Sequence, residues 1–150
     1  ADAAGSLGLP SFIGRRMRHH TATVETVVDF TPTSAGDFAG LMAFMDEAHF
    51  ITLGIEGTGN GRSVTLRRRI SAEASERGEV LASAPIPASG AVELRMGIDK
   101  GTAHLAWRAA GEDQWRELAA GVDVEPMASI HAGLFTGVVI GPYAVRGAAE

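Results

Sequence analysis

The chain has no cysteine, and its 150 residues include only two Trp, one Tyr and six Phe. The lack of cysteine excludes disulfides and thiolate metal sites, although it leaves the cellular compartment open. No apolar run approaches the roughly 20 residues that a membrane-spanning helix requires, so we expect no membrane contact. Residues 1–10 lack the basic and apolar stretches that begin a signal peptide. We favour a cytoplasmic location over secretion, and we expect a chain without an initiating Met to be an excised piece.

Positive charge is scarce and unevenly placed. The 13 basic and 18 acidic residues give a net charge of −5, which argues against nucleic acid as a partner. The single lysine is Lys100, and most arginines fall in two clusters, Arg15-Arg16 with Arg18 and Arg67-Arg68-Arg69 after Arg62. In the second cluster, alternation places Arg67 and Arg69 on one strand face and Arg68 on the other. We favour a solvated strand face for it over a patch for nucleic acid or an acidic ligand.

Alternating hydrophobicity predicts β-strands along most of the chain. The clearest strand is Thr21–Phe30, in which apolar residues recur at even positions and polar residues at odd ones. Alternation over 91–98 and 102–108 predicts a hairpin, because Asp99-Lys100-Gly101 between them is a turn sequence. Residues 38–45 fit a strand or a short helix, but the turn at Asp46-Glu47 and the alternation of residues 49–56 favour a second hairpin.

Further strands are predicted over residues 11–18, 62–70, 79–84 and 115–118. Ile70 is expected to point inward, and Pro85 is expected to end the strand over 79–84. Residues 121–132 follow no pattern. Residues 134–144 are continuously apolar around Val138-Val139-Ile140, which predicts a strand buried on both faces, with a bulge or close approach at Gly137. Nine or ten short strands without a long helix predict an all-β antiparallel sandwich over 11–150. Residues 1–10 are expected to be a flexible lead-in or the end of a linker.

Four stretches, taken in order, resemble one protein family. They are Pro10–Arg16 followed by His, Ala39–Leu41 with Glu47–Leu53, Ala106–Trp115, and Phe135–Gly141. The third resembles a Phe/Tyr-Ser-x-Asp-Gly-x-x-Trp hairpin, and the fourth resembles a Phe-Thr-Gly-Ala-x-Val-Gly signature. The family is the C-terminal concanavalin A-like domain of β-xylosidases and related enzymes of glycoside hydrolase family 43.

This resemblance implies a jelly-roll β-sandwich that packs on a five-bladed propeller of the same polypeptide, where the catalytic carboxylates reside. It also implies that Phe135 contributes to the rim of the xylose pocket, because an apolar ring can stack on the face of a sugar. A xylo-oligosaccharide would then lie at the domain interface. The chain departs from the family at Met17, where Gln is usual, and after Val145, where the family has a further Ala-Asp-Phe-Asp-x-Phe strand. The final strand is therefore expected to be clipped, or its neighbour to remain an unpaired edge.

No catalytic site is expected on this chain itself. Glycosidases need two carboxyls about 5–10 Å apart across a cleft. The candidates fall on outward strand positions or in turns, namely Glu25, Asp29, Asp46, Glu47, Glu56, Asp99 and Asp113. No metal site or cofactor is expected, because His19 and His20 would point to opposite faces of a strand. Calcium at Asp46-Glu47 has only weak support, since no run of Asp or Asn ligands surrounds it.

Two pairs of residues remain as binding candidates. Arg15 and Arg16 occupy adjacent strand positions, so one is expected to face inward or toward a partner. We favour an ion pair for it, within the domain or with a neighbouring one, over an exposed role. Trp107 shares a strand face with Leu105, which favours core packing. Trp115 follows a turn, and core packing and sugar stacking both remain open for it.

These observations predict a non-catalytic accessory domain of a family 43 glycoside hydrolase, either a β-xylosidase or an α-L-arabinofuranosidase. The alternative is an autonomous lectin-like module for xylan or arabinoxylan, which needs two or more exposed aromatic residues along one face. A purely structural or assembly domain would instead show a broad apolar patch. Homo-oligomerisation stays open in each case.

Overall fold

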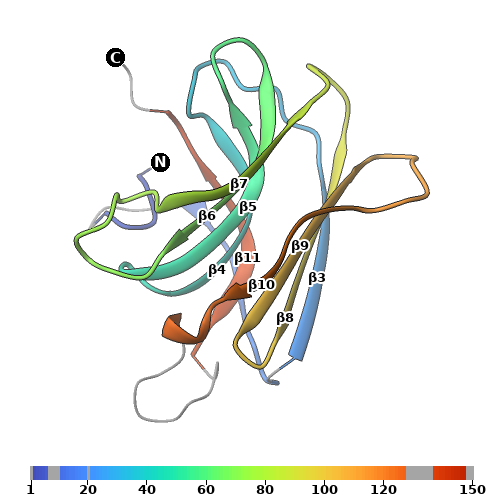
Figure 1. The fold of residues 1–150 in the computed structure, drawn as a ribbon. Coiled ribbons are helices and arrows are strands. Elements are labelled where there is room, and N and C mark those ends of the chain that lie inside the picture. The colour runs from blue at the N-terminus through green and yellow to red at the C-terminus, as the bar shows by residue number, and fades with distance from the viewer. Residues whose placement is uncertain (1, 7–10, 20, 128–136, 148–150) are drawn as a thin grey trace.

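The computed structural model describes residues 2–6, 11–19, 21–127 and 137–147, and it shows two β-sheets packed face to face (Figure 1). Every strand pair is antiparallel. The strands are β1 (Ser11–Phe12), β2 (Arg15–Arg16), β3 (Thr21–Val28), β4 (Phe38–Asp46), β5 (His49–Gly57), β6 (Arg62–Arg69), β7 (Glu79–Ile86), β8 (Val92–Asp99), β9 (Thr102–Ala109), β10 (Arg116–Asp123) and β11 (Val139–Val145). A short 3₁₀ helix, η1 (Glu125–Met127), follows β10.

The larger sheet has the order β1-β11-β4-β5-β6-β7, and β2 also pairs with β11. The smaller sheet has the order β10-β9-β8-β3. Short turns join β4 to β5 and β8 to β9, and Lys100 and Gly101 at the second turn have φ of 46° and 93°. Two successive positive φ angles match the twist of a tight hairpin. The predicted antiparallel sandwich and both predicted hairpins are confirmed.

The main core lies between the sheets. Alternate residues of β8 and β9 supply one side of it, with Val92, Leu94, Met96, Ile98, Ala103, Leu105 and Trp107 all buried. The larger sheet supplies the other side through Leu41, Ala43, Ile51, Leu53, Ile55, Val64 and Leu66. The predicted core position of Trp107 is confirmed, since 6% of its surface is exposed.

A second apolar cluster covers the outer face of the larger sheet. It contains Ala4, Phe38, Met42, Phe50, Tyr143 and Val145. The N-terminal segment lies against this face, where the backbone N–H of Ala4 donates to the Tyr143 hydroxyl at 3.0 Å. Strand β4 therefore buries most of both faces, which explains its continuously apolar sequence.

In β11, Ile140, Gly141, Tyr143 and Val145 are buried, but Pro142 and Ala144 are exposed. The predicted burial of residues 134–144 on both faces is therefore wrong for one face of the second half of β11. Residues 134–136 lie outside the described residues.

Glycine permits close backbone contact at one point of β11. A Cβ at Gly141 would lie 1.9 Å from the Ile13 carbonyl oxygen and 2.6 Å from the Cα of Gly14. The strip that joins β1 to β2 thus lies directly on β11. Gly137, for which a close approach was predicted, precedes the strand, and a Cβ there would meet only the flexible end of Met45, at 3.0 Å.

Several predicted strand ends are wrong, each for a local reason. Ile70 is 38% exposed rather than inward, because β6 ends at Arg69. Strand β7 continues through Pro85, which an edge strand tolerates because it has no partner on one side. Strand β10 extends to Asp123, and its register shifts against β9 between Glu117 and Ala119 and again before Val122. Such irregularities break the alternation from which a strand is predicted.

The arginines after β5 are not the solvated face that was predicted. Arg62 and Arg69 are only 4% and 5% exposed. The Arg62 guanidinium donates to the carbonyls of Phe30, Pro87 and Gly90 at 2.6–2.7 Å. The Arg69 guanidinium donates to four carbonyls from three separate segments, those of Gly5, Glu47, Ala72 and Ala74. These charges therefore hold loops in place.

Candidate functional site

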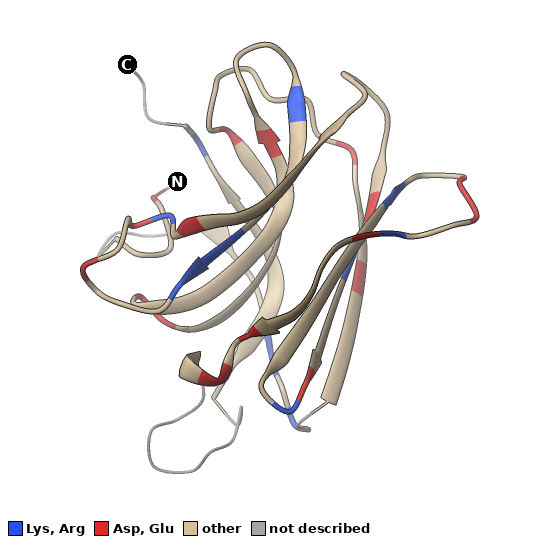
Figure 2. Cartoon of the chain, viewed as in Figure 1, with Lys and Arg blue, Asp and Glu red and all other residues tan. Residues whose placement is uncertain are grey.

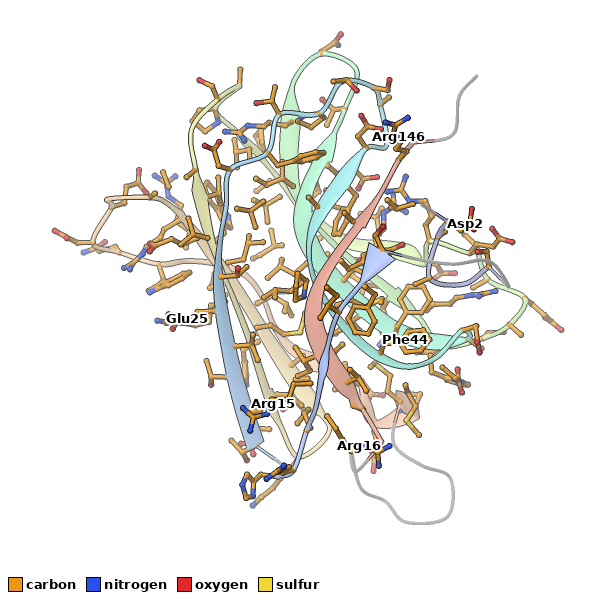
Figure 3. The ribbon with its side chains drawn as sticks, turned by 180° about the vertical axis from the view of Figure 1, so that it is seen from behind. Asp2, Arg15, Arg16, Glu25, Phe44 and Arg146 are labelled. Atoms are coloured by element: carbon orange, nitrogen blue, oxygen red, sulfur yellow. The ribbon has the colours of Figure 1, made fainter. Side chains whose placement is uncertain are left out.

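The two sheets leave an opening along one side of the sandwich, between β3 and residues 11–19 (Figure 3). We call this strip the open seam. In the described part of the chain, β3 pairs only with β8, and β1 and β2 pair only with β11. Both sides of the seam are therefore sheet edges, which are the places where a sheet can accept a partner.

Two hollows follow each other along the open seam. The first has a volume of about 630 Å³ and lies between β1 and the end of β3, with Ile13, Val27 and Pro142 in its wall. The second has a volume of about 370 Å³ and is enclosed by Arg15–His19, Ala22, Val24 and Ile140. The seam thus has an apolar half and a half bordered by arginines.

Strand register determines where the arginines point. Arg15 lies opposite Ile140, which is in the core between the sheets, so its side chain leans toward β3. Arg16 lies opposite Val139 and points to the other face of the sheet, as Figure 3 shows. Met17, which follows Arg16 in the sequence, is only 7% exposed, and its N–H donates to the Val138 carbonyl at 2.8 Å. The two side chains therefore point to opposite faces of the sheet, and neither is buried within the domain.

Neither arginine has a counter-ion among the described residues. The side chains of Arg15 and Arg16 form no hydrogen bond or ion pair there, and both residues are exposed. Of the two kinds of ion pair expected for them, only the pair with another domain therefore remains a prediction. The apolar half of the open seam was not anticipated. Its signal in the sequence was Val27, the apolar residue that interrupts the polar positions of β3.

Phe135, predicted at the pocket rim, lies outside the described residues, as do His20 and His131. The described residues contain no cluster of three or more His, Asp or Glu that could hold a metal ion. His49 instead forms a pair with Asp46 at 2.8 Å. Nor does any helix in the described ranges have the length and apolar character to cross a membrane.

Trp115 lies on the smaller sheet with two cations over its ring. The Cζ atoms of Arg95 and Arg108 are 4.0 and 4.4 Å from the ring centroid. Arg95 also pairs with Glu25 at 2.8 Å, and Arg108 pairs with Glu93. Acidic and basic residues alternate over this sheet in Figure 2. Trp115 is half-buried among these groups.

Glu56, one of the candidate carboxylates, is engaged in ion pairs. Glu56 was expected on an outward position or in a turn, but it is 7% exposed and accepts two hydrogen bonds from the Arg67 guanidinium, at 2.8 and 3.3 Å. Arg77 lies 3.7 Å from the same carboxylate. Burial lowers the pKa of Arg77, and the Glu56 charge opposes that shift. Glu56 thereby joins β5 to Arg67 of β6 and to Arg77 in the loop before β7.

Asp37 is also fully engaged. It accepts hydrogen bonds from the Gly147 N–H at 2.8 Å and from Thr33 and Ser34 at 2.9–3.0 Å. These bonds, that of Gly147 first, lower the pKa of Asp37 from 3.8 to about 2. Asp37 thereby joins the loop before β4 to the backbone after β11.

Comparison with known proteins agrees with this architecture. The chain matches the family model of the β-xylosidase C-terminal concanavalin A-like domain over residues 2–150. A xylan β-1,4-xylosidase from Bacillus halodurans C-125 is 22% identical with a TM-score of 0.82, and the match covers 95% of this chain and 28% of that one. The GH43B protein of a Bacteroides ovatus xyloglucan PUL is 28% identical with a TM-score of 0.75, over 90% of this chain and 25% of that one. The GH43 protein BlXynB from Bacillus licheniformis is 18% identical with a TM-score of 0.73, over 91% and 26%.

This chain therefore spans about a quarter of the length of each of these solved proteins. A search of curated proteins found no match. The family match extends over nearly the whole sequence, and the two-sheet sandwich agrees with it. The predicted resemblance is confirmed: the chain belongs to the family of C-terminal concanavalin A-like domains found in β-xylosidases of glycoside hydrolase family 43.

Proposed function

We propose that this chain is the non-catalytic accessory domain of a family 43 glycoside hydrolase with β-xylosidase-like or α-L-arabinofuranosidase-like activity. It packs on a catalytic propeller of the same polypeptide and contributes Phe135 to the rim of the sugar pocket. The observation that carries this proposal is the family match over residues 2–150. The environment of Glu56 is compatible with it, because this carboxylate, the buried one of the candidate set, is paired with Arg67 and Arg77.

The test is Phe135→Ala in the full-length enzyme, assayed with xylobiose and an aryl xyloside. An aromatic contact of about 0.5–1.5 kcal/mol corresponds to a loss of about 2- to 12-fold in kcat/KM. Trp115→Ala is the matched control, since it removes another aromatic ring from the same domain, on the smaller sheet. Equal kcat/KM for wild type and Phe135→Ala would refute the role of Phe135 in the pocket.

The autonomous binding module remains the competing function, and the structure offers little for it. No aromatic side chain in the described ranges is fully exposed, and Trp115 has guanidiniums over its ring. Calorimetric titration of the isolated chain with xylobiose, xylohexaose and arabinoxylan separates the two functions. The accessory role predicts no measurable heat, whereas a dissociation constant of about 1 mM or tighter that weakens in Trp115→Ala would favour the binding module.

A further inference from the structure

The open seam exposes apolar surface in an unusual concentration. Ile13 and Val27 are 80% and 60% exposed, the highest values among the exposed large hydrophobic side chains of the described residues. Both belong to the wall of the 630 Å³ hollow. They lie on opposite sides of it, one beside β1 and the other on β3. A partner that entered here would remove both from water at once.

The same seam also contains most of the arginines whose side chains have no partner among the described residues. Eight of the twelve arginines donate to, or pair with, a group of their own domain, and these are Arg62, Arg67, Arg68, Arg69, Arg77, Arg95, Arg108 and Arg116. The four without such a bond in the described part of the chain are Arg15, Arg16, Arg18 and Arg146. Three of these four lie within four residues, along the second hollow. Every other described arginine except Arg146 donates to or pairs with a group of its own domain, so three side chains without a described partner in one place indicate a function outside the domain.

The backbone of residues 13–17, which carries Arg15 and Arg16, is held firmly enough against β11 to act as a docking surface. The Ile13 N–H donates to the Pro142 carbonyl at 3.2 Å, and the Met17 N–H donates to the Val138 carbonyl at 2.8 Å. Both bonds attach residues 13–17 to β11 and the residue before it, and the backbone of Ile13 and Gly14 also lies in close contact with Gly141. Because the backbone is already ordered, a partner pays little entropy to fix it.

We infer that the open seam is the surface on which the catalytic module docks. The docking segment presents carboxylates to Arg15 and Arg18 along the second hollow and reaches around the sheet edge to Arg16, which points to the other face, and it presents apolar side chains to Ile13 and Val27. The inference rests on the proposed accessory function and names the chemistry of its partner. Guanidinium and carboxylate form two parallel hydrogen bonds, which fixes orientation as well as affinity. An apolar hollow beside them excludes water and strengthens the charged contact.

A second copy of this chain is a poorer occupant. In a two-fold symmetric dimer the same patch meets itself, so the three arginines of each copy would approach one another. Like charges brought together in this way destabilise a contact. The net charge of −5 also disfavours polyanions as partners, since most of the surface would repel them.

The first experiment maps the partner directly in the full-length enzyme. Ile13 is replaced by the photo-crosslinking residue p-benzoylphenylalanine, and the cross-linked peptides are identified by mass spectrometry. The inference predicts one peptide of the catalytic module that contains Asp or Glu next to apolar residues. Cross-links confined to this domain, cross-links between two copies, or no cross-link would each overturn it.

The second experiment tests the charges. R15E/R16E in the full-length enzyme is compared with Arg146→Glu, a partnerless arginine at the opposite end of β11 (Figure 3). We expect R15E/R16E to raise the rate of proteolysis between the modules at least tenfold and to split one calorimetric unfolding transition into two, and Arg146→Glu to do neither. Far-UV circular dichroism confirms that each variant is folded. Equal proteolysis and melting of the two variants would overturn the inference.

The two proposals fail separately. If R15E/R16E behaves as Arg146→Glu while Phe135→Ala still lowers kcat/KM, the seam is not the docking surface but the accessory function stands. If Phe135→Ala has no effect while the Ile13 cross-link reaches the catalytic module, the pocket role is wrong and the docking surface is correct.

Discussion

Replacing Arg69 with Met should destabilise this domain more than any neighbouring substitution of the same kind. The guanidinium is 5% exposed and donates to carbonyls of the N-terminal segment, the β4–β5 turn and the loop before β7. These segments are distant in sequence, and Gly5 is 64 residues away. Met preserves much of the apolar stem, so the change removes mainly the hydrogen bonds.

The magnitude follows from which carbonyls can return to water. Glu47 and Ala72 are exposed, and their carbonyls are expected to rehydrate, whereas Gly5 and Ala74 are half-buried. Two hydrogen bonds from a charged donor, at about 1.5–3 kcal/mol each, therefore set a loss of about 3–6 kcal/mol. For a domain of this length, at about 2–4 °C per kcal/mol, that corresponds to a fall in Tm of about 6–24 °C.

Thermal unfolding followed by circular dichroism measures this loss. Arg68→Met is the matched control, because the adjacent arginine donates a single bond, to the Asp123 carbonyl at 2.7 Å. Its loss should lower Tm by only about 2–4 °C. Arg69→Lys should recover little, since an ammonium cannot span the same four carbonyls. If Arg69→Met and Arg68→Met melt within about 2 °C of each other, the reasoning is refuted.

Three further predictions concern other contacts. Gly141→Ala should cost about 1–3 kcal/mol by forcing the strip between β1 and β2 off β11, whereas Gly61→Ala, with no atom within 4 Å of its Cβ, should be nearly neutral in the same melting assay. Lowering the pH from about 4 to 2 should remove the stability that Asp37 contributes, because the pKa of Asp37 is lower in the folded state than in the unfolded state. Asp37→Asn should therefore reduce the dependence of Tm on pH in that window, and an unchanged dependence would contradict this. Glu56→Gln should destabilise the domain by about 2–3 kcal/mol, because it leaves Arg67 with a neutral partner. The double variant with Arg67→Gln should recover part of that loss, and no recovery would count against the pairing.

Local pattern was sufficient for much of the fold. The alternation of residues 21–28, 92–98 and 102–107 predicted both the strands and their buried faces, because a strand side chain points in or out with a period of two. The Asp99-Lys100-Gly101 turn was predicted for a similar reason, since its positive φ angles suit Gly. Prediction failed where the register shifts, in β10, and where a strand simply ends, before Ile70.

The candidate site was predicted only in part. Arg15 and Arg16 were identified from adjacent strand positions, but the apolar hollow beside them depends on which strands end each sheet. Trp115 could not be assigned from its turn, because the guanidiniums of Arg95 and Arg108 arrive from two other strands. The role of Phe135 remains a prediction from the family resemblance.

Arg67, Arg68 and Arg69 show the division most clearly. The sequence by itself determined that they lie on a strand with Arg67 and Arg69 on one face, since that requires only the period of two. Tertiary structure decided that Arg67 meets a buried carboxylate, that Arg68 reaches the Asp123 carbonyl at the end of β10, and that Arg69 joins three segments distant in sequence. The partner of a long charged side chain depends on which backbone groups lie within its reach in the folded domain, and those groups can come from residues distant in the sequence.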